Sequence, residues 1–347
     1  MSRGIGEFDP IQETIPEWMA VVVALLTQFG DIWFLALVLA AFYWIGSPKR
    51  DDIATVAGVW LAGMGLYKGL KEIFGFPRPD EPLLEPELLP IVVQQLYEAT
   101  AFATGYGFPS GHAVNTTIVY LGLAHVLTVS TRRRRFAVAA ALIAIVSFSR
   151  VALGVHYLVD VVVGVGVGLA LLAAVKAILD RQLADRATIT FAVAIGFGGF
   201  FVVTSEAAVE AVLILAASLG AFAGWQLIVL GRRLVTVELP SQAVRPIAIR
   251  GGLAALALAP LVGALEYFPI LSVYAAAGVA GLGTAAVVTV PILRHSERAR
   301  RVGVALAFWL KAAGAGVRYL LSPRTWRRGF GFLRDYASRL RNEDRNR

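Results

Sequence analysis

The chain has 347 residues, of which 57% are hydrophobic and 16% are charged, whereas a soluble domain carries about a quarter charged residues. Uncharged runs such as 211–230 and 271–293 are long enough to cross a bilayer. The composition therefore excludes an ordinary soluble protein and predicts an all-α integral membrane protein with several spans. The absence of cysteine excludes disulfides and thiolate metal sites.

The chain starts with a short tail at residues 1–15, which holds one arginine and several acidic residues. A secretory signal begins with basic residues, so this tail is not expected to be one. Apolar segments that predict helices then follow at about 16–29, 31–46, 52–70, 112–130, 134–149, 156–178, 187–204, 207–230, 247–264 and 268–293. Gly30 and Asp31 separate the first segment, which is short, from the second. It is either a short span or a helix in the membrane interface.

The segments suggest two membrane domains followed by a tail. Residues 16–180 are expected to form a core of six helices, and residues 187–293 an additional transmembrane domain of about four helices whose role the sequence does not indicate. Residues 300–347 mix many basic residues with aromatic ones. That mixture is typical of amphipathic helices lying on anionic lipid, and it predicts a basic amphipathic tail on the cytoplasmic side.

The net charge of +8 is distributed between the apolar segments rather than over one soluble face. We therefore expect membrane lipids as partners and no nucleic acid. The strongly basic connections all fall on one side of the membrane, which the positive-inside rule makes cytoplasmic. They contain Lys49 and Arg50, Arg132–Arg135, Lys176 with Arg181 and Arg186, Arg232 with Arg233, Arg245 and Arg250, and Arg294–Arg301.

The opposite, extracytoplasmic side keeps few cations, namely Lys71, Arg78 and Arg150, with Lys68 close by in a helix end. A cation near an apolar segment is costly, at about 2.5–3.5 kcal/mol in the centre of a span and less near its ends. Each of these residues could simply extend toward the membrane surface. Together they could instead bind an anion.

Three short stretches on this side contain residues suited to phosphate chemistry. The first runs from Lys71 to Arg78 and Pro79, the second is Pro109-Ser110-Gly111-His112, and the third runs from Ser149-Arg150 through His156 to Asp160. Arginine can hold phosphate oxygens with two hydrogen bonds, and lysine adds a point charge. Ser110 and Gly111 precede a predicted helix, whose free N–H groups attract anions.

His156 and Asp160 are spaced i and i+4, which places them on one face of a helix. The carboxylate can hold one imidazole nitrogen as N–H and leave a lone pair on the other, as a nucleophile requires. His112 could act as the proton donor to a leaving oxygen. Taken singly, each residue also has a structural interpretation: Asp160 as a first-turn acid and Ser110 as a helix N-cap.

The three stretches resemble the signature of the type 2 phosphatidic acid phosphatase family, the membrane-embedded branch of the lipid phosphatase and haloperoxidase-like superfamily. That signature is written K-x6-R-P, P-S-G-H and S-R-x5-H-x3-D, and every fixed position is present in order. The resemblance covers roughly residues 16–178. It implies that His156 attacks phosphorus, that Asp160 orients it and that His112 protonates the leaving group. It also implies that Lys71, Arg78, Ser110, Gly111 and Arg150 bind phosphate, with neither metal nor cofactor.

The expected function is hydrolysis of a lipid phosphomonoester or pyrophosphate through a phosphohistidine, with phosphatidic acid, phosphatidylglycerol phosphate and isoprenoid pyrophosphate as candidate substrates. A phosphotransferase that uses an alcohol in place of water, a sugar-phosphate phosphatase and a phosphatase core fused to a lipid-transport module remain open.

The loop from Gly75 to Phe108 is a candidate lid. Glu206, Glu210 and Glu266 lie at outer turns and either are interfacial acids or shape the entry of a head group. Gly164, Gly166 and Gly168 are expected to permit close helix packing.

Overall fold

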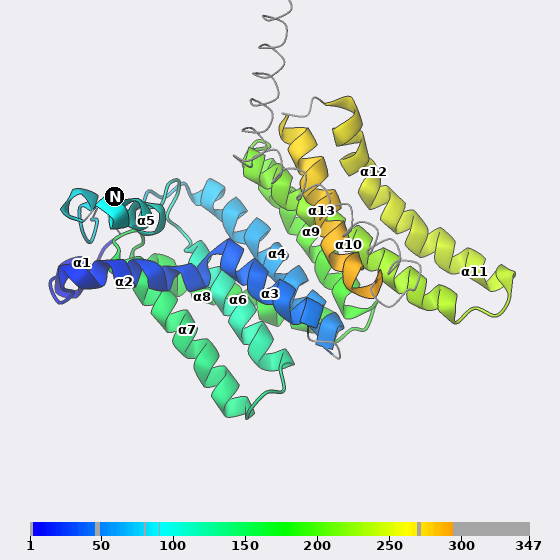
Figure 1. The fold of residues 1–347 in the computed structure, drawn as a ribbon, viewed down its shortest axis with the longest axis horizontal. Coiled ribbons are helices and arrows are strands. Elements are labelled where there is room, and N and C mark those ends of the chain that lie inside the picture. Colours follow the sequence, from blue (N-terminus) through cyan, green and yellow to red (C-terminus); the bar gives the residue numbers. More distant parts are fainter. Residues whose placement is uncertain (1–2, 46–48, 80, 90, 269–271, 294–347) are drawn as a thin grey trace, which may run out of the picture. The chain divides into compact units, whose positions relative to one another are not determined.

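The structure, a computed structural model, describes residues 3–45, 49–79, 81–89, 91–268 and 272–293. Within these ranges every regular element is a helix (Figure 1). Met1–Thr289 form one compact unit, and of the second unit, Val290–Arg347, only the end of the last helix is described. The basic tail expected at 300–347 lies outside the described residues.

The first half of the chain forms helices close to the predicted segments. These helices are α1 (Phe8–Gln12), α2 (Glu17–Thr27), η1 (Gln28–Gly30), α3 (Ile32–Ile45), α4 (Arg50–Phe74), α6 (Gly111–Val126), α7 (Arg132–Ala152) and α8 (Leu158–Leu179). The connection between α4 and α6 carries η3 (Pro86–Leu88) and α5 (Ile91–Ala101). The candidate lid therefore contains a helix, and α5 packs through Tyr97 and Ala101 against Ala20 and Val23 of α2.

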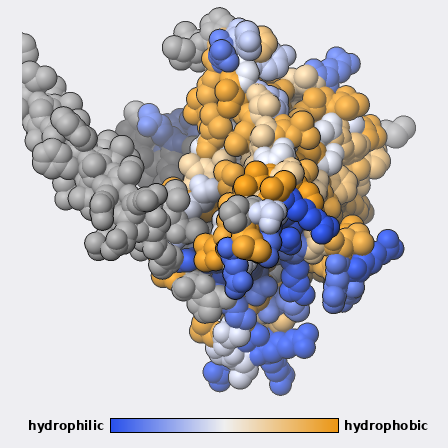
Figure 2. Space-filling view, turned by 90° about the vertical axis from the view of Figure 1, so that its right-hand side faces the viewer, coloured by the Kyte–Doolittle hydropathy of each residue, from blue (hydrophilic) through white to orange (hydrophobic). Residues whose placement is uncertain are grey.

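The described chain contains seven helices that are long and apolar enough to cross a membrane, and an eighth if the bent pair at 18–45 counts as one span. Their outward side chains are apolar: Val203, Leu256 and Val162 are 79%, 74% and 61% exposed. Figure 2 shows one such face, where hydrophobic side chains form a broad area and hydrophilic ones gather toward the lower end. A large exposed apolar surface marks a contact with membrane or protein, and together with the candidate spans it indicates that the protein is a multi-pass membrane protein.

The structure places the first apolar segment at one end of the helix bundle. Helix α2 has only 11 residues, too few for a span, and the chain bends by 49° between it and α3. Gln12, the last residue of α1, donates to Ala152 O at the end of α7. Thr27, the last residue of α2, accepts from Arg150, also in the last turn of α7. Thr27 and the segment that precedes α2 thus both lie at one end of the bundle, so α2 lies across that end.

The second half continues the same helical unit. It consists of α9 (Arg186–Thr204), α10 (Val209–Val235), α11 (Pro240–Pro246), η4 (Ile247–Gly251), α12 (Gly252–Tyr267) and α13 (Val273–Leu293). Glycines on α4 let α9 approach closely, since a Cβ on Gly65 would lie 2.6 Å from the carbonyl of Phe197. A Cβ on Gly69 would likewise strike the ring of Phe200. The additional helices are therefore packed directly on the helix that carries Lys71.

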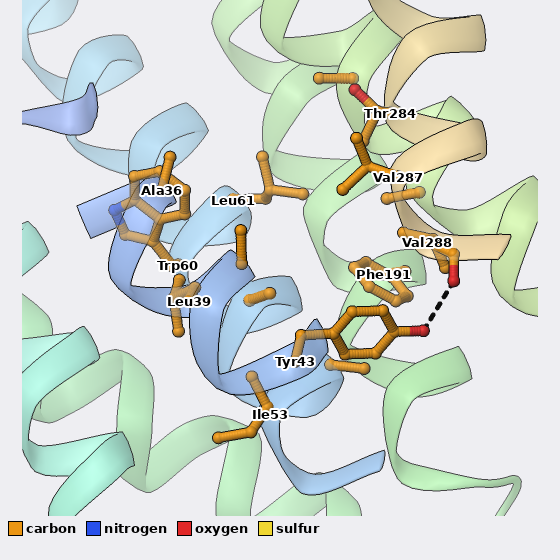
Figure 3. A pocket seen from close by; sticks show the side chains of 15 residues that line it. Ala36, Leu39, Tyr43, Ile53, Trp60, Leu61, Phe191, Thr284, Val287 and Val288 are labelled. Carbon is orange, nitrogen blue, oxygen red and sulfur yellow. Dashed lines mark hydrogen bonds between the residues drawn. The ribbon is translucent and has the colours of Figure 1, made fainter. Parts of the chain in front are cut away.

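An apolar cavity of about 250 Å³ lies where α3 and α4 meet α9, α10 and α13. Leu39, Trp60 and Phe191 are among the side chains that line it (Figure 3). At its edge the Tyr43 hydroxyl donates a 2.7 Å hydrogen bond to the carbonyl oxygen of Val288 (Figure 3). This bond links α3 to α13, so early and late segments of the chain share one packed interior.

The close packing of α4 on α9 predicts that Gly65→Ala destabilises the protein. The added methyl meets backbone atoms that cannot rotate away, and such overpacking costs about 1–3 kcal/mol. Thermal unfolding in detergent should show a lower midpoint. Gly196→Ala on α9 is the matched control, because nothing lies within 4 Å of its Cβ position. Equal midpoints for the two variants would contradict this account of the packing.

Candidate active site

The three sequence stretches meet at one end of the helix bundle. Lys71 lies in the last turn of α4, and Ser110 directly precedes α6. Arg150 lies in the last turn of α7, and Asp160 in the first turn of α8. Arg78 lies in the loop after α4, and His156 in the turn between α7 and α8. Every residue that the sequence analysis assigned to the site is therefore at the level where these helices begin or end.

His156 is held on both ring nitrogens. Its Nδ1 lies 3.4 Å from Oδ2 of Asp160, and its Nε2 lies 3.0 Å from Nη1 of Arg78. A guanidinium can only donate hydrogen bonds, so Nε2 must accept and carry a lone pair. The ring proton then lies on Nδ1 and points to the carboxylate. This is the tautomer that a nucleophilic Nε2 needs.

The geometry of this pair differs from the sequence expectation in one respect. Helix α8 begins at Leu158, so His156 lies two residues before it and not on it. Asp160 turns back over the start of the helix, where its Oδ2 also accepts a 3.1 Å bond from the backbone N–H of Tyr157. The carboxylate therefore caps the helix and orients the histidine at the same time, which a simple i, i+4 pair on a helix face does not describe.

His112, the candidate acid, is held by a residue that the sequence analysis did not assign. Its Nε2 lies 2.9 Å from Oδ1 of Asp31. Asp31 follows the bend between η1 and α3, and the preceding Gly30 packs so closely that a Cβ there would lie 2.9 Å from His112 Cδ2. The sequence signal was the Gly30-Asp31 break itself. A second histidine–carboxylate pair thus faces the same end of the bundle.

Among the described residues, several buried polar atoms near this end of the bundle have no hydrogen-bond partner, including the Ser110 hydroxyl, Nε of Arg150, and Nε and Nη1 of Arg3. Ser110 is fully buried, and its hydroxyl caps no backbone N–H of α6. Arg150 is 3% exposed and donates from Nη1 to Thr27 at 2.9 Å, while its Nε is unpartnered. An unsatisfied buried polar group costs about 1–3 kcal/mol. These donors are suited to a ligand that accepts hydrogen bonds, such as an oxyanion.

The other two cations are anchored by backbone carbonyl groups of the long loop and of the turn between α7 and α8. Lys71 Nζ donates to Tyr106 O at 2.6 Å. Arg78 donates to the carbonyl oxygens of Val155, at 2.9 Å, and of Thr104 and Gly105. Neither cation forms an ion pair among the described residues. Their positive charges are positioned without being neutralised, which leaves them available to an anion.

The electrostatic environment keeps His156 neutral. Burial lowers the pKa of His156 well below its usual value, and the nearby cations Arg78, Arg150 and Lys71 lower the pKa further. A neutral imidazole retains the lone pair on Nε2. The cations that would bind an anion therefore also keep the candidate nucleophile in its reactive form.

Small residues allow the site's helices to approach one another. A Cβ on Gly111 would lie 2.5 Å from the Tyr67 ring, and one on Gly164 would lie 2.7 Å from Ser110 O. A Cβ on Gly168 would lie 2.9 Å from Thr117, whereas Gly166 faces open space. The close packing expected at these glycines is thus present at Gly164 and Gly168. The additional helices also reach this region, because Glu210 of α10 pairs with Lys68 one turn before Lys71.

Together, the fold and the site define a multi-pass membrane protein with a buried, cation-lined site around two histidine–carboxylate pairs. Residues 52–184 match the PAP2 superfamily. The resemblance drawn from the three sequence stretches is confirmed by that match.

Two known proteins are similar to the chain. A lipid phosphate phosphatase delta from Arabidopsis thaliana is 29% identical over 146 residues, which cover 40% of this chain and 33% of that protein. The chain therefore matches about a third of the length of this relative. A transmembrane PAP2-type phosphatidylglycerolphosphate phosphatase from Bacillus subtilis is 25% identical in its crystal structure. That similarity covers 50% of this chain and 83% of the other, with a TM-score of 0.41.

The unpartnered hydroxyl of Ser110 predicts that Ser110→Ala leaves stability unchanged but weakens anion binding. A hydrogen bond to a charged group contributes about 1.5–3 kcal/mol, so the affinity for vanadate should fall roughly tenfold or more. Thr131→Ala is the control, because Thr131 does cap its helix by accepting from Arg134 N. That control should lose about 0.5–2 kcal/mol of stability and keep vanadate affinity. If Ser110→Ala instead lost stability and kept its vanadate affinity, Ser110 would be an ordinary helix N-cap.

Proposed function

We propose that the protein is a membrane phosphatase that removes phosphate from a lipid phosphomonoester or pyrophosphate through a phosphohistidine at His156. The observation that carries this proposal is the pair of contacts on His156. Arg78 holds a lone pair on Nε2, and Asp160 accepts the Nδ1 proton, close to cations that form no ion pair among the described residues. This arrangement is suited to attack on an anionic phosphorus centre, with no step that requires a metal or cofactor.

In the proposed reaction the phosphate enters among Lys71, Arg78 and Arg150, and Arg78 exchanges its contact with Nε2 for phosphate oxygens. The Nε2 lone pair then forms a bond to phosphorus as the bond to the lipid oxygen breaks. His112 gives its proton to that oxygen, and Asp31 stabilises the imidazolium before the transfer. Asp160 stabilises the positive charge that develops on His156. Preorganised donors of this kind supply the largest share of catalysis in many enzymes.

The second half of the reaction reverses these roles. A water molecule gives a proton to His112, now neutral, and its oxygen attacks the phosphorus. The bond between Nε2 and phosphorus breaks, which returns the lone pair to His156 and releases inorganic phosphate. One histidine thus serves as nucleophile and leaving group, and the other as acid and then base.

A lipid is the substrate class that agrees best with the position of the site. The catalytic groups lie at the ends of membrane helices, where a lipid can present its head group while its chains stay in the bilayer. The relative from Arabidopsis thaliana is itself described as acting on lipid phosphates. The proposed topology places the site on the extracytoplasmic face and the C-terminus in the cytoplasm, because the basic connections lie at the opposite ends of the helices.

Substitution of the two histidines should separate their roles. His156→Ala is expected to abolish phosphate release and the acid-labile phosphoenzyme. His112→Ala is expected to lower release about 10²–10⁴-fold, as loss of an acid–base group does, while an aryl phosphate with a good leaving group still labels the protein. His125→Ala is the control, because His125 is exposed in the last turn of α6 and should keep full activity. Labelling of the His156→Ala protein would contradict the proposal.

A screen of the purified protein should use lipid monophosphates and lipid pyrophosphates, with and without an acceptor alcohol and with a chelator. The proposal predicts release of phosphate in the presence of chelator. A strict requirement for added metal, or turnover of soluble phosphates alone, would contradict it.

The pH profile of kcat/KM follows from the environment of His156. A group whose pKa is lowered stays neutral to lower pH, so the acid limb due to His156 should lie below the usual histidine value of about 6.5. Arg78→Met removes one of the cations, which should raise the pKa of His156 and move the acid limb to higher pH. Measuring the pH profile with two substrates whose phosphate groups differ in pKa distinguishes titration of the enzyme from titration of the substrate. A limb that moves to lower pH in the variant would contradict the assignment.

A further inference from the structure

The N-terminal segment reaches the catalytic carboxylate through one arginine. Arg3 Nη2 lies 3.0 Å from Oδ1 and 3.3 Å from Oδ2 of Asp160. The same nitrogen donates to Pro77 O at 3.0 Å, next to Arg78 in the chain. Arg3 therefore connects the residue that orients His156 with the loop that carries a phosphate-binding cation. The resemblance to a phosphatase family assigned no role to this segment.

The guanidinium of Arg3 lies among three aromatic rings, with Nη2 hydrogen-bonded and with Nε and Nη1 buried without a partner among the described residues. Its central carbon is 4.8 Å from the centroid of the Phe76 ring and 4.9 Å from that of Tyr157, with Phe108 at 5.8 Å. Such cation–π contacts are strongest where water is excluded, and the Arg3 side chain is only 16% exposed. Phe76 and Phe108 belong to the connection between α4 and α6, and Tyr157 directly precedes α8, so residues far from Arg3 in the sequence fix the position of its guanidinium.

The rest of the segment is anchored by separate contacts. Glu7 accepts a 3.1 Å bond from Leu158 N at the start of α8. Burial raises the pKa of Glu7, but bonds from the backbone N–H groups of Leu158 and Ile5 lower it further than burial raises it. Phe8 packs on Tyr157 with ring centroids 5.7 Å apart. Gln12 donates to Glu81 O and Ala152 O. Arg3 is thus not required to attach the segment, which leaves its contact with Asp160 to be explained.

Charge balance at Asp160 gives that explanation. The carboxylate is fully buried, and a buried carboxylate needs a paired cation or it takes up a proton. His156 is neutral before the reaction and cannot supply the charge. Among the described residues, Arg3 is the cation that forms an ion pair with Asp160. Without it, a proton on Asp160 would remove the acceptor that fixes the Nδ1–H tautomer of His156.

We propose that Arg3 is a positioning residue of the phosphatase reaction, which keeps the Asp160 carboxylate ionised and directed at His156. This inference rests on the proposed function, and it extends the catalytic machinery to a residue outside the matched domain at 52–184. Arg3 acts through Asp160 and does not contact the reacting phosphorus.

A double-mutant cycle with the full chain tests this role. Arg3→Ala should lower kcat about 10–100-fold, by analogy with the loss of a hydrogen-bond partner that orients a metal-binding histidine, with little change in KM for a lipid monophosphate. In the Asp160→Asn background, Arg3→Ala should cause no further loss, because the carboxylate on which it acts is absent. Arg3→Lys should recover part of kcat. Gln12→Ala is the matched control, since it removes an anchor of the same segment without touching Asp160.

Equal fold losses from Arg3→Ala in both backgrounds would show that Arg3 only anchors the segment, and would overturn the inference. So would unchanged kcat in Arg3→Ala. Thermal unfolding of the unaltered protein, Arg3→Ala, Asp160→Asn and the double variant measures the Arg3–Asp160 coupling without turnover. Coupled midpoints in a protein that hydrolyses no lipid phosphate would refute the proposed function but support the contact, whereas uncoupled midpoints in an active enzyme would refute the inference alone.

Discussion

The hydrogen bond from Arg78 to Nε2 of His156 constrains the rest of the site. Because the guanidinium can only donate, it fixes the lone pair on Nε2, and the proton on Nδ1 then requires an acceptor. Asp160 supplies that acceptor, but a buried carboxylate needs a cation of its own, which Arg3 provides. A chain of alternating donors and acceptors therefore runs from the loop after α4 through the histidine to the N-terminal segment.

The helices are packed so that this chain can form. Glycines at 111 and 164 bring α4, α6 and α8 together around Ser110, and the bend before α3 places Asp31 beside His112. Helix α2 lies across the end of the bundle, and its Thr27 accepts a hydrogen bond from Arg150. Each element thus contributes a polar contact at the same level, while its remaining length is apolar and faces other helices or lipid.

Most of the helices could be predicted from the sequence. His112, His156, Asp160 and the candidate phosphate-binding residues could also be assigned to one side of the membrane, because their spacing and the alternation of basic connections are local signals. Asp31 and Arg3 could not be found in this way. The role of Asp31 depends on a bend between two helices. The role of Arg3 depends on a contact with Asp160, which lies more than 150 positions later in the chain. The roles of the additional helices are likewise not encoded in a motif, although Glu210 links them to Lys68.

The central claim is that His156 presents a neutral imidazole with its lone pair on Nε2. Nitrogen-15 NMR of histidine-labelled protein at neutral pH tests this claim most directly, with the His156 signals assigned by their loss in a His156→Gln variant. The account predicts a protonated Nδ1 and an unprotonated Nε2. A proton on Nε2, or on both nitrogens, would contradict it.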